Sequence, residues 1–161
     1  MDQTHLHLLI THLPIIGSVL GAFVLAYGLW TKSSDTKIAA YGLLIISSVA
    51  AGIAYITGEA AEETVENLQG ISEKVIEQHE DFALYALIGL ILLGLVSIIA
   101  IFVTIKKLSL ANPLATITLL LSLFSFGLVA YTGYLGGMIR HTEVGNGAVQ
   151  NSSESSVEES D

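Results

Sequence analysis

The stretch Phe82–Ile105 reads FALYALIGLILLGLVSIIAIFVTI and contains no charged residue. It is longer than the roughly 20 apolar residues that an α-helix needs to cross about 30 Å of hydrocarbon. Three further uncharged runs have the same character, the first of them once it is extended upstream: Leu13–Trp30, Ile38–Gly58 and Pro113–Ile139. Because backbone polar groups find no water in hydrocarbon, each run must be helical. The sequence therefore predicts an all-α integral membrane four-helix bundle.

Composition supports a membrane protein and excludes several kinds of site. Hydrophobic residues make up 52% of the chain and charged residues 13%, which is unusual for a soluble domain and ordinary for a membrane bundle. The formal net charge of -9 gives no support to a nucleic-acid partner, which needs a basic face. The chain has no cysteine, which excludes disulfides, thiolate metal sites, cysteine nucleophiles and covalently attached c-type haem. The partner that the sequence indicates is the lipid bilayer.

The chain divides into one membrane domain, residues 1–144, and a serine- and glutamate-rich tail, residues 145–161, which we expect to be disordered. We place the spans at about 7–30, 38–58, 82–105 and 113–139. Short connectors follow the first and third spans, so the bundle should consist of two tandem antiparallel hairpins. Segment 59–81 combines regularly spaced glutamates with apolar stripes, which predicts short amphipathic helices over one mouth of the bundle.

The distribution of basic residues predicts the orientation. The two short connectors carry Lys32, Lys37, Lys106 and Lys107, whereas the opposite side carries only Lys74 and Arg140. Basic loops favour the cytoplasm, so both termini and segment 59–81 should be periplasmic in a bacterial inner membrane. We expect Tyr27, Trp30 and Tyr41 to anchor the bundle at the cytoplasmic interface.

All five histidines fall at the end of the bundle opposite the short connectors, because odd spans run away from that surface and even spans return to it. They are His5, His7, His12, His79 and His141, and Glu59, Glu62 and Glu63 reach the same end. His79 shares a helix face with apolar residues, and His141 follows two glycines at four-residue intervals, so we expect both imidazoles to face the interior. Ionisable groups at membrane depth usually have a function.

A short internal repeat relates the two hairpins. The sequence AYITG at 54–58 ends the second span, and AYTG at 130–133 ends the fourth. His12 enters the first span, two residues before Pro14, and His79 enters the third. Two hairpins of the same orientation would give this pattern, with His12 and His79 in equivalent positions.

These residues suggest a haem site. Haem in a four-helix bundle typically needs two histidines from facing helices. His12, His79 and His141 are the candidate axial ligands of one haem b, any two of them sufficing, and Arg140 would pair with a propionate. The protein would then carry electrons as a redox subunit or partner, alone, as a homo-oligomer or within a larger membrane complex, and would not be a complete enzyme.

Two other hypotheses stay open. Imidazole and carboxylate groups also bind divalent transition metals. The candidate ligands of such a site are His7, His12, Glu59, Glu63, His79 and His141. Alternatively, the protein binds no cofactor and serves as a scaffold or assembly subunit, whose interior histidines form hydrogen bonds to the glutamates of segment 59–81.

Three motifs carry a family resemblance: HLLITHLP at 7–14, TGEAAEE at 57–63 and GGMIRH at 136–141. With them the chain resembles, over roughly residues 5–143, a widespread family of small bacterial four-helix membrane proteins of unknown function. The resemblance implies the fold and leaves the function open. The layout is also similar to that of membrane b-type cytochromes, although here one face of the bundle has no histidine. The analogy therefore extends to a single haem at the histidine-bearing end.

Overall fold

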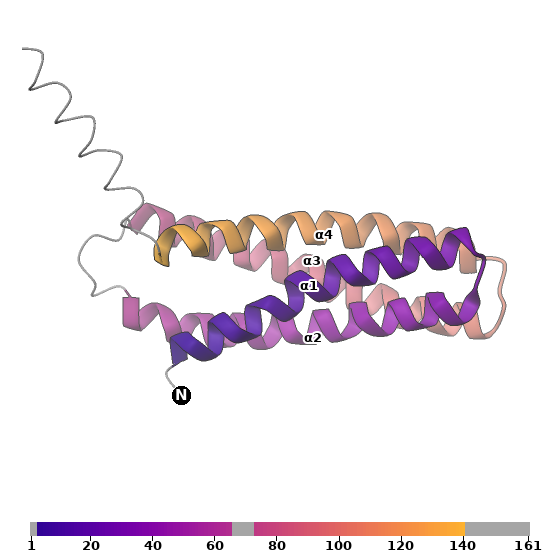
Figure 1. Ribbon diagram of the computed structural model, residues 1–161, viewed down its shortest axis with the longest axis horizontal. Helices are drawn as coiled ribbons and strands as arrows, with labels where there is room; N and C mark the ends of the chain where they lie inside the picture. Colours follow the sequence, from indigo (N-terminus) through magenta and orange to yellow (C-terminus); the bar gives the residue numbers. More distant parts are fainter. Residues whose placement is uncertain (1–2, 66–72, 141–161) are drawn as a thin grey trace, which may run out of the picture.

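The computed structural model describes residues 3–65 and 73–140 as four long helices (Figure 1). They are α1 (Gln3–Trp30), α2 (Ser34–Val65), α3 (Glu73–Ile105) and α4 (Ala111–Arg140). Each is long and apolar enough to cross a membrane. The prediction of an all-α four-helix integral membrane bundle is confirmed. Residues 1–2, 66–72 and 141–161, which include the predicted tail, lie outside the described part.

The helices form one bundle in which consecutive helices are antiparallel neighbours and α4 closes the ring against α1 (Figure 1). In this view α1 crosses its neighbours obliquely and has its most extensive contact with α2. We call the end where α1 and α3 begin the histidine end. The opposite end, which contains both short connectors, we call the lysine end.

The two short connectors use the same helix stop. The amide of Ser33 donates to the carbonyl of Gly28 at 3.0 Å, and that of Leu108 donates to Val103 at 3.1 Å. Lys32 and Lys107, the residues before these donors, have φ of 56° and 52°. Both helices therefore end at a residue with left-handed backbone conformation, followed by a residue whose amide bonds to the carbonyl five positions before it. Glycine is more usual than lysine at the left-handed position.

Two expectations differ from the structure. The glutamate-rich stretches within the described residues continue the spanning helices, with α2 reaching Val65 and α3 beginning at Glu73. No proline separates these stretches from the spans, and the one glycine at a junction, Gly58, costs a helix only about 1 kcal/mol, so each stretch continues its spanning helix. Tyr41 is 0% exposed, so its predicted role as an interface anchor is wrong, whereas Trp30 is 80% exposed.

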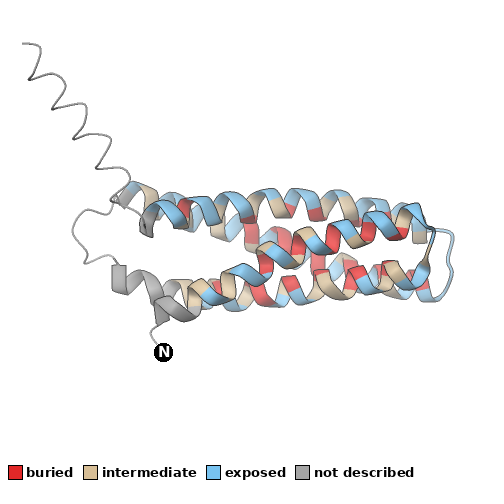
Figure 2. Cartoon of the chain, viewed as in Figure 1, coloured by how far each residue is buried: buried red, intermediate tan, exposed pale blue. Residues whose placement is uncertain are grey.

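Buried and exposed positions alternate along each helix (Figure 2). The interior of the bundle combines many small and hydroxyl-bearing side chains with a few large ones, while many large apolar side chains are exposed. Fully buried hydroxyl residues come from all four helices: Ser18, Ser47, Ser97, Thr118, Ser122 and Ser125. Lipid is as apolar as leucine, so membrane helices associate through close packing of small residues and through interhelical hydrogen bonds. The Ser47 hydroxyl makes such a bond by donating to the carbonyl of Pro14 at 3.0 Å.

Gly94 gives a test of this packing. A Cβ atom at Gly94 would lie 2.7 Å from the Cβ of Ser48, whereas a Cβ at Gly127 would meet nothing within 4 Å. We expect Gly94→Leu to lower the free energy of unfolding by about 1–3 kcal/mol through overpacking. Gly127→Leu, the matched control, should change it little. Thermal unfolding in detergent measures both, and equal midpoints would show that α2 and α3 do not meet at Gly94.

The two hairpins repeat in a constant register that differs from the one predicted. Gly17 packs on Ser47, and Gly89 packs on Ser125 in the same way. A residue of α1 corresponds to the residue of α3 that lies 72 positions later, as Gly17 does to Gly89. A residue of α2 corresponds to the residue of α4 that lies 78 positions later, as Ser47 does to Ser125.

The burial pattern follows the same register. Every buried position among the described side chains of α1 has a buried counterpart in α3: Pro14, Ser18, Gly21, Ala22, Leu25 and Gly28 match Ala86, Leu90, Leu93, Gly94, Ser97 and Ala100. In this register His79 corresponds to His7, and not to His12.

Candidate cofactor site

His7 lies in the second turn of α1 and packs against the end of α2. Its Nδ1 is 2.9 Å from the carbonyl oxygen of Ala54 and 3.3 Å from the Thr57 hydroxyl. The imidazole rests on Gly58, where a Cβ would lie only 3.1 Å from the Cε1 of His7. A side chain at position 58 would therefore push the ring out of place.

His79 repeats this arrangement in the second hairpin. Its Nδ1 is 3.0 Å from the carbonyl oxygen of Thr132 on α4. Its ring rests on Gly136, where a Cβ would again lie 3.1 Å from the imidazole Cε1. In each hairpin the accepting carbonyl belongs to the residue four positions before the glycine. In each hairpin, one imidazole thus donates a hydrogen bond to a backbone carbonyl and packs on a glycine of the neighbouring helix.

The carbonyl partners fix the tautomer of both rings. A carbonyl oxygen can only accept a hydrogen bond, so the Nδ1 atoms of His7 and His79 are the protonated nitrogens and donate to Ala54 and Thr132. In a neutral imidazole the lone pair then lies on Nε2. Metal-binding histidines are commonly held in this state, with one ring nitrogen donating to a backbone carbonyl and the other acting as the ligand.

The two imidazoles also lie near each other. They are close enough for the charge of one to act on the other. They come from α1 and α3, which the ring order of the bundle places across from each other. The repeat thus brings together two equivalent histidines from opposite helices at one end of a membrane bundle.

His12 is not part of this pair. Its imidazole is exposed, and its Nδ1 donates to the carbonyl of Leu8 in its own helix at 2.7 Å. Five residues separate His7 from His12, which is a rotation of about 140° around a helix. Both cannot face the interior, and His7 is the one that packs on α2. The counterpart of His12 in the second hairpin is Leu84, which is also exposed.

The other predicted ligands lie outside the described side chains. Glu59, Glu63 and Arg140 belong to helices, but only their backbones are described, and His141 follows the last described residue. Among the described residues, no three histidine or carboxylate side chains gather at one point. The prediction of a non-haem metal site therefore depends on side chains that the structure does not describe.

Gly58 and Gly136 are the site residues that the sequence reasoning missed. The predicted repeat aligned Gly58 with Gly133, because AYITG and AYTG are similar in composition. In the structure Gly133 faces Ile15, at 3.3 Å from a Cβ placed there, and Gly136 lies under His79. The signal that could have found this register is the constant spacing of glycine, serine and histidine between the hairpins.

Comparisons with protein-family models, with curated proteins and with solved structures give no match for this chain. The function is therefore inferred from the geometry of the two histidines.

Proposed function

We propose that the protein is a membrane-embedded haem b protein that carries electrons, with His7 and His79 as the axial ligands. The observation that supports this most is the repeated arrangement of an imidazole on a glycine, with its Nδ1 held by a helix carbonyl. Two histidines on opposite helices, each held at Nδ1 so that Nε2 would be the ligand atom, are the donor set that a b-type haem in a helix bundle requires.

The residues of this chain would orient the ligands and leave the redox chemistry to the group that they hold. The Ala54 and Thr132 carbonyls hold a proton on each Nδ1, which leaves the lone pair of the neutral ring on Nε2, and hydrogen bonding at Nδ1 makes the imidazoles more basic ligands. Haem supplies a one-electron couple whose potential responds to axial ligation, hydrogen bonding and burial. Because the pair lies at one end of the bundle, electrons would be exchanged at that membrane surface.

We propose that this surface is the periplasmic face of a bacterial inner membrane. The lysine end carries the exposed Lys32, Lys106 and Lys107 in its two connectors, with the buried Lys37 beside them, and basic residues at the ends of spans favour the cytoplasm. The redox partner would then be a periplasmic protein or the exposed part of a larger membrane complex.

A spectroelectrochemical titration of the haem-loaded protein tests the electron-transfer role. We expect one reversible couple that fits a single electron per haem, because two histidines would hold the group and leave no position open to a substrate. An irreversible titration, or rapid binding of carbon monoxide by the reduced protein, would instead indicate an open coordination position and contradict simple electron transfer.

A further inference from the structure

The lysine end contains a buried cation whose charge no described residue balances. Lys37 is only 4% exposed, and its Nζ donates to the Oδ1 of Asn112 at 2.9 Å. Its stem packs closely on α1, since a Cβ at Gly28 would lie 3.0 Å from the Cγ of Lys37. Within residues 3–65 and 73–140 no ion pair of Lys37 is found, and Asp35 is the one acidic residue of the sequence near this end. A buried charge normally requires a partner.

The surrounding backbone also favours negative charge. Lys37 lies in the first turn of α2, and Asn112 lies in the first turn of α4. The amino-terminal ends of helices carry partial positive charge, so two of them meet the lysine ammonium at this point. Two helix ends and a lysine all disfavour a further cation and stabilise an anion.

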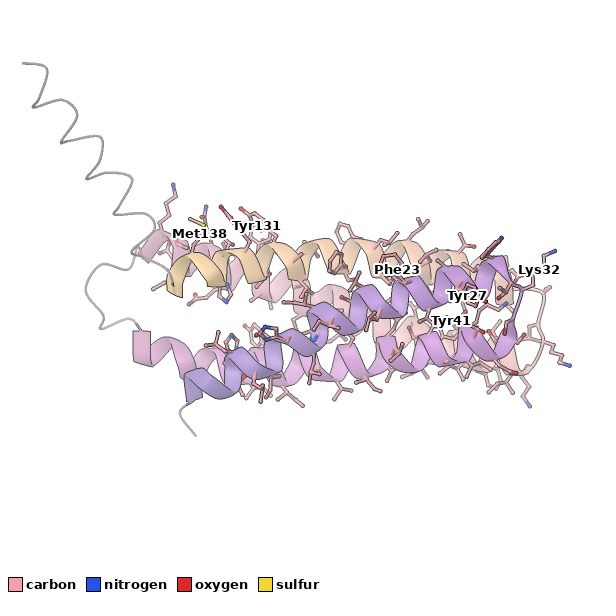
Figure 3. All side chains as sticks on the ribbon, viewed as in Figure 1. Phe23, Tyr27, Lys32, Tyr41, Tyr131 and Met138 are labelled. Carbon is pink, nitrogen blue, oxygen red and sulfur yellow. The ribbon has the colours of Figure 1, made fainter. Side chains whose placement is uncertain are left out.

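Two buried hydroxyls complete the polar environment. Tyr41 is 0% exposed and Thr104 is 3% exposed. Their side chains lie close enough to interact with each other, but neither hydroxyl has a well-formed hydrogen bond among the described residues. Tyr41 is one turn after Lys37 on the same face of α2, and helix side chains lean toward the amino terminus, so its hydroxyl leans toward the lysine. Figure 3 shows Tyr41 near the lysine end, where Lys32 extends away from the bundle.

The repeat shows that the fold does not require this polar group. The counterparts of Lys37 and Tyr41 in α4 are Ala115, which is fully buried, and Leu119. The second hairpin therefore packs the same positions with apolar side chains. Since only the first hairpin has a lysine and a tyrosine at these positions, Lys37 and Tyr41 indicate a role other than packing.

We infer that the lysine end binds a small inorganic anion of halide size between Lys37, Asn112, Tyr41 and Thr104. The anion would accept hydrogen bonds from the lysine ammonium and from the two hydroxyls, and it would balance the buried charge. Because Lys37 is 4% exposed and packs against Gly28 of α1 and Asn112 of α4, a halide suits the site better than a phosphate group attached to a lipid. This site is separate from the histidine pair and does not depend on the proposed haem function.

Chloride binding to the haem-free protein tests the inference. Protein purified in sodium gluconate is titrated with chloride at constant ionic strength, and the thermal midpoint and the ³⁵Cl NMR linewidth are recorded. We expect a saturable rise of the midpoint and excess line broadening in the wild-type protein. Lys37→Met, which keeps the stem but removes the charge, should lose both effects, while Lys32→Met, at an exposed lysine of the same end, should keep them.

Tyr41→Phe removes one hydroxyl without changing the packing and should weaken chloride binding by about tenfold, the usual effect of one hydrogen bond to a charged group. If Lys37→Met does not fold, this variant decides the matter by the same titration. An unchanged chloride response in Tyr41→Phe and Lys37→Met would overturn the inference, as would a wild-type protein that does not respond to chloride. Stabilisation by phosphatidylglycerol in nanodiscs without any chloride response would also overturn it and assign Lys37 to a lipid phosphate.

Discussion

Replacing either His7 or His79 with alanine should abolish the spectrum of a haem with two histidine ligands. Each variant loses one of two equivalent ligands, so the remaining imidazole can hold at most a haem with one protein ligand. We expect the sharp α and β bands of the reduced protein to disappear and haem affinity to fall by about tenfold or more. Reduced absorption spectra and haem titrations of the detergent-purified variants measure both effects.

His12→Ala is the matched control for this experiment. His12 lies on α1, as His7 does, but it is exposed, and among the described residues its imidazole bonds only to Leu8. Its replacement should leave the spectrum and the haem affinity of the protein unchanged. If His12→Ala lost the reduced bands while His7→Ala kept them, the haem ligand in α1 would be His12, as the sequence suggested. His7, which packs on Gly58, would then not be a ligand.

Gly136→Val should impair the site almost as strongly, although glycine cannot bind a cofactor. A Cβ at this position would already lie 3.1 Å from the Cε1 of His79, and the γ-methyl groups of valine would displace the imidazole from the Thr132 carbonyl. Loss of a hydrogen bond that orients a ligand typically weakens metal affinity by about 10- to 100-fold. We expect a loss of haem affinity in this range, measured by titration of the haem-free protein.

The neighbouring glycine provides the control. A Cβ at Gly137 would meet nothing within 4 Å, so Gly137→Val has the same effect on helix propensity without touching the imidazole. In the first hairpin, Gly58→Val and Gly52→Val form the equivalent pair, since a Cβ at Gly52 also meets nothing. Equal haem affinities within each pair would mean that the glycines under His7 and His79 have no part in the site.

The fold could be predicted from the sequence because the membrane leaves few alternatives. An uncharged run such as Phe82–Ile105 must be helical in lipid, and short connectors make its neighbours antiparallel. The gathering of the histidines at one end follows from the direction of the chain alone. None of these inferences requires knowledge of which way a side chain points.

The choice between His7 and His12 did require that knowledge, and the sequence did not provide it. Pro14 stood between the two histidines and the span, and a proline can either begin a helix or lie within one. In the structure α1 continues through Pro14, which fixes the helical phase and turns His7 inward. With the phase uncertain, the similar pentapeptide and tetrapeptide at the ends of α2 and α4 gave the wrong register for the repeat.

The polar group at the lysine end escaped prediction for a related reason. Tyrosine near the end of a span is usually an interface anchor, and lysine in a short connector is usually solvated. Lys37 and Tyr41 share a face of α2 that points into the bundle, and only the packing of α1, α3 and α4 around that face shows that both are buried.

We expect His7 and His79 to hold a haem. The most direct test is the absorption spectrum of the protein purified in detergent from cells supplied with ample haem, recorded oxidised and after reduction with dithionite. We expect a Soret band, sharp α and β bands on reduction, and one haem per chain. A featureless spectrum in both states, from folded protein, would contradict it.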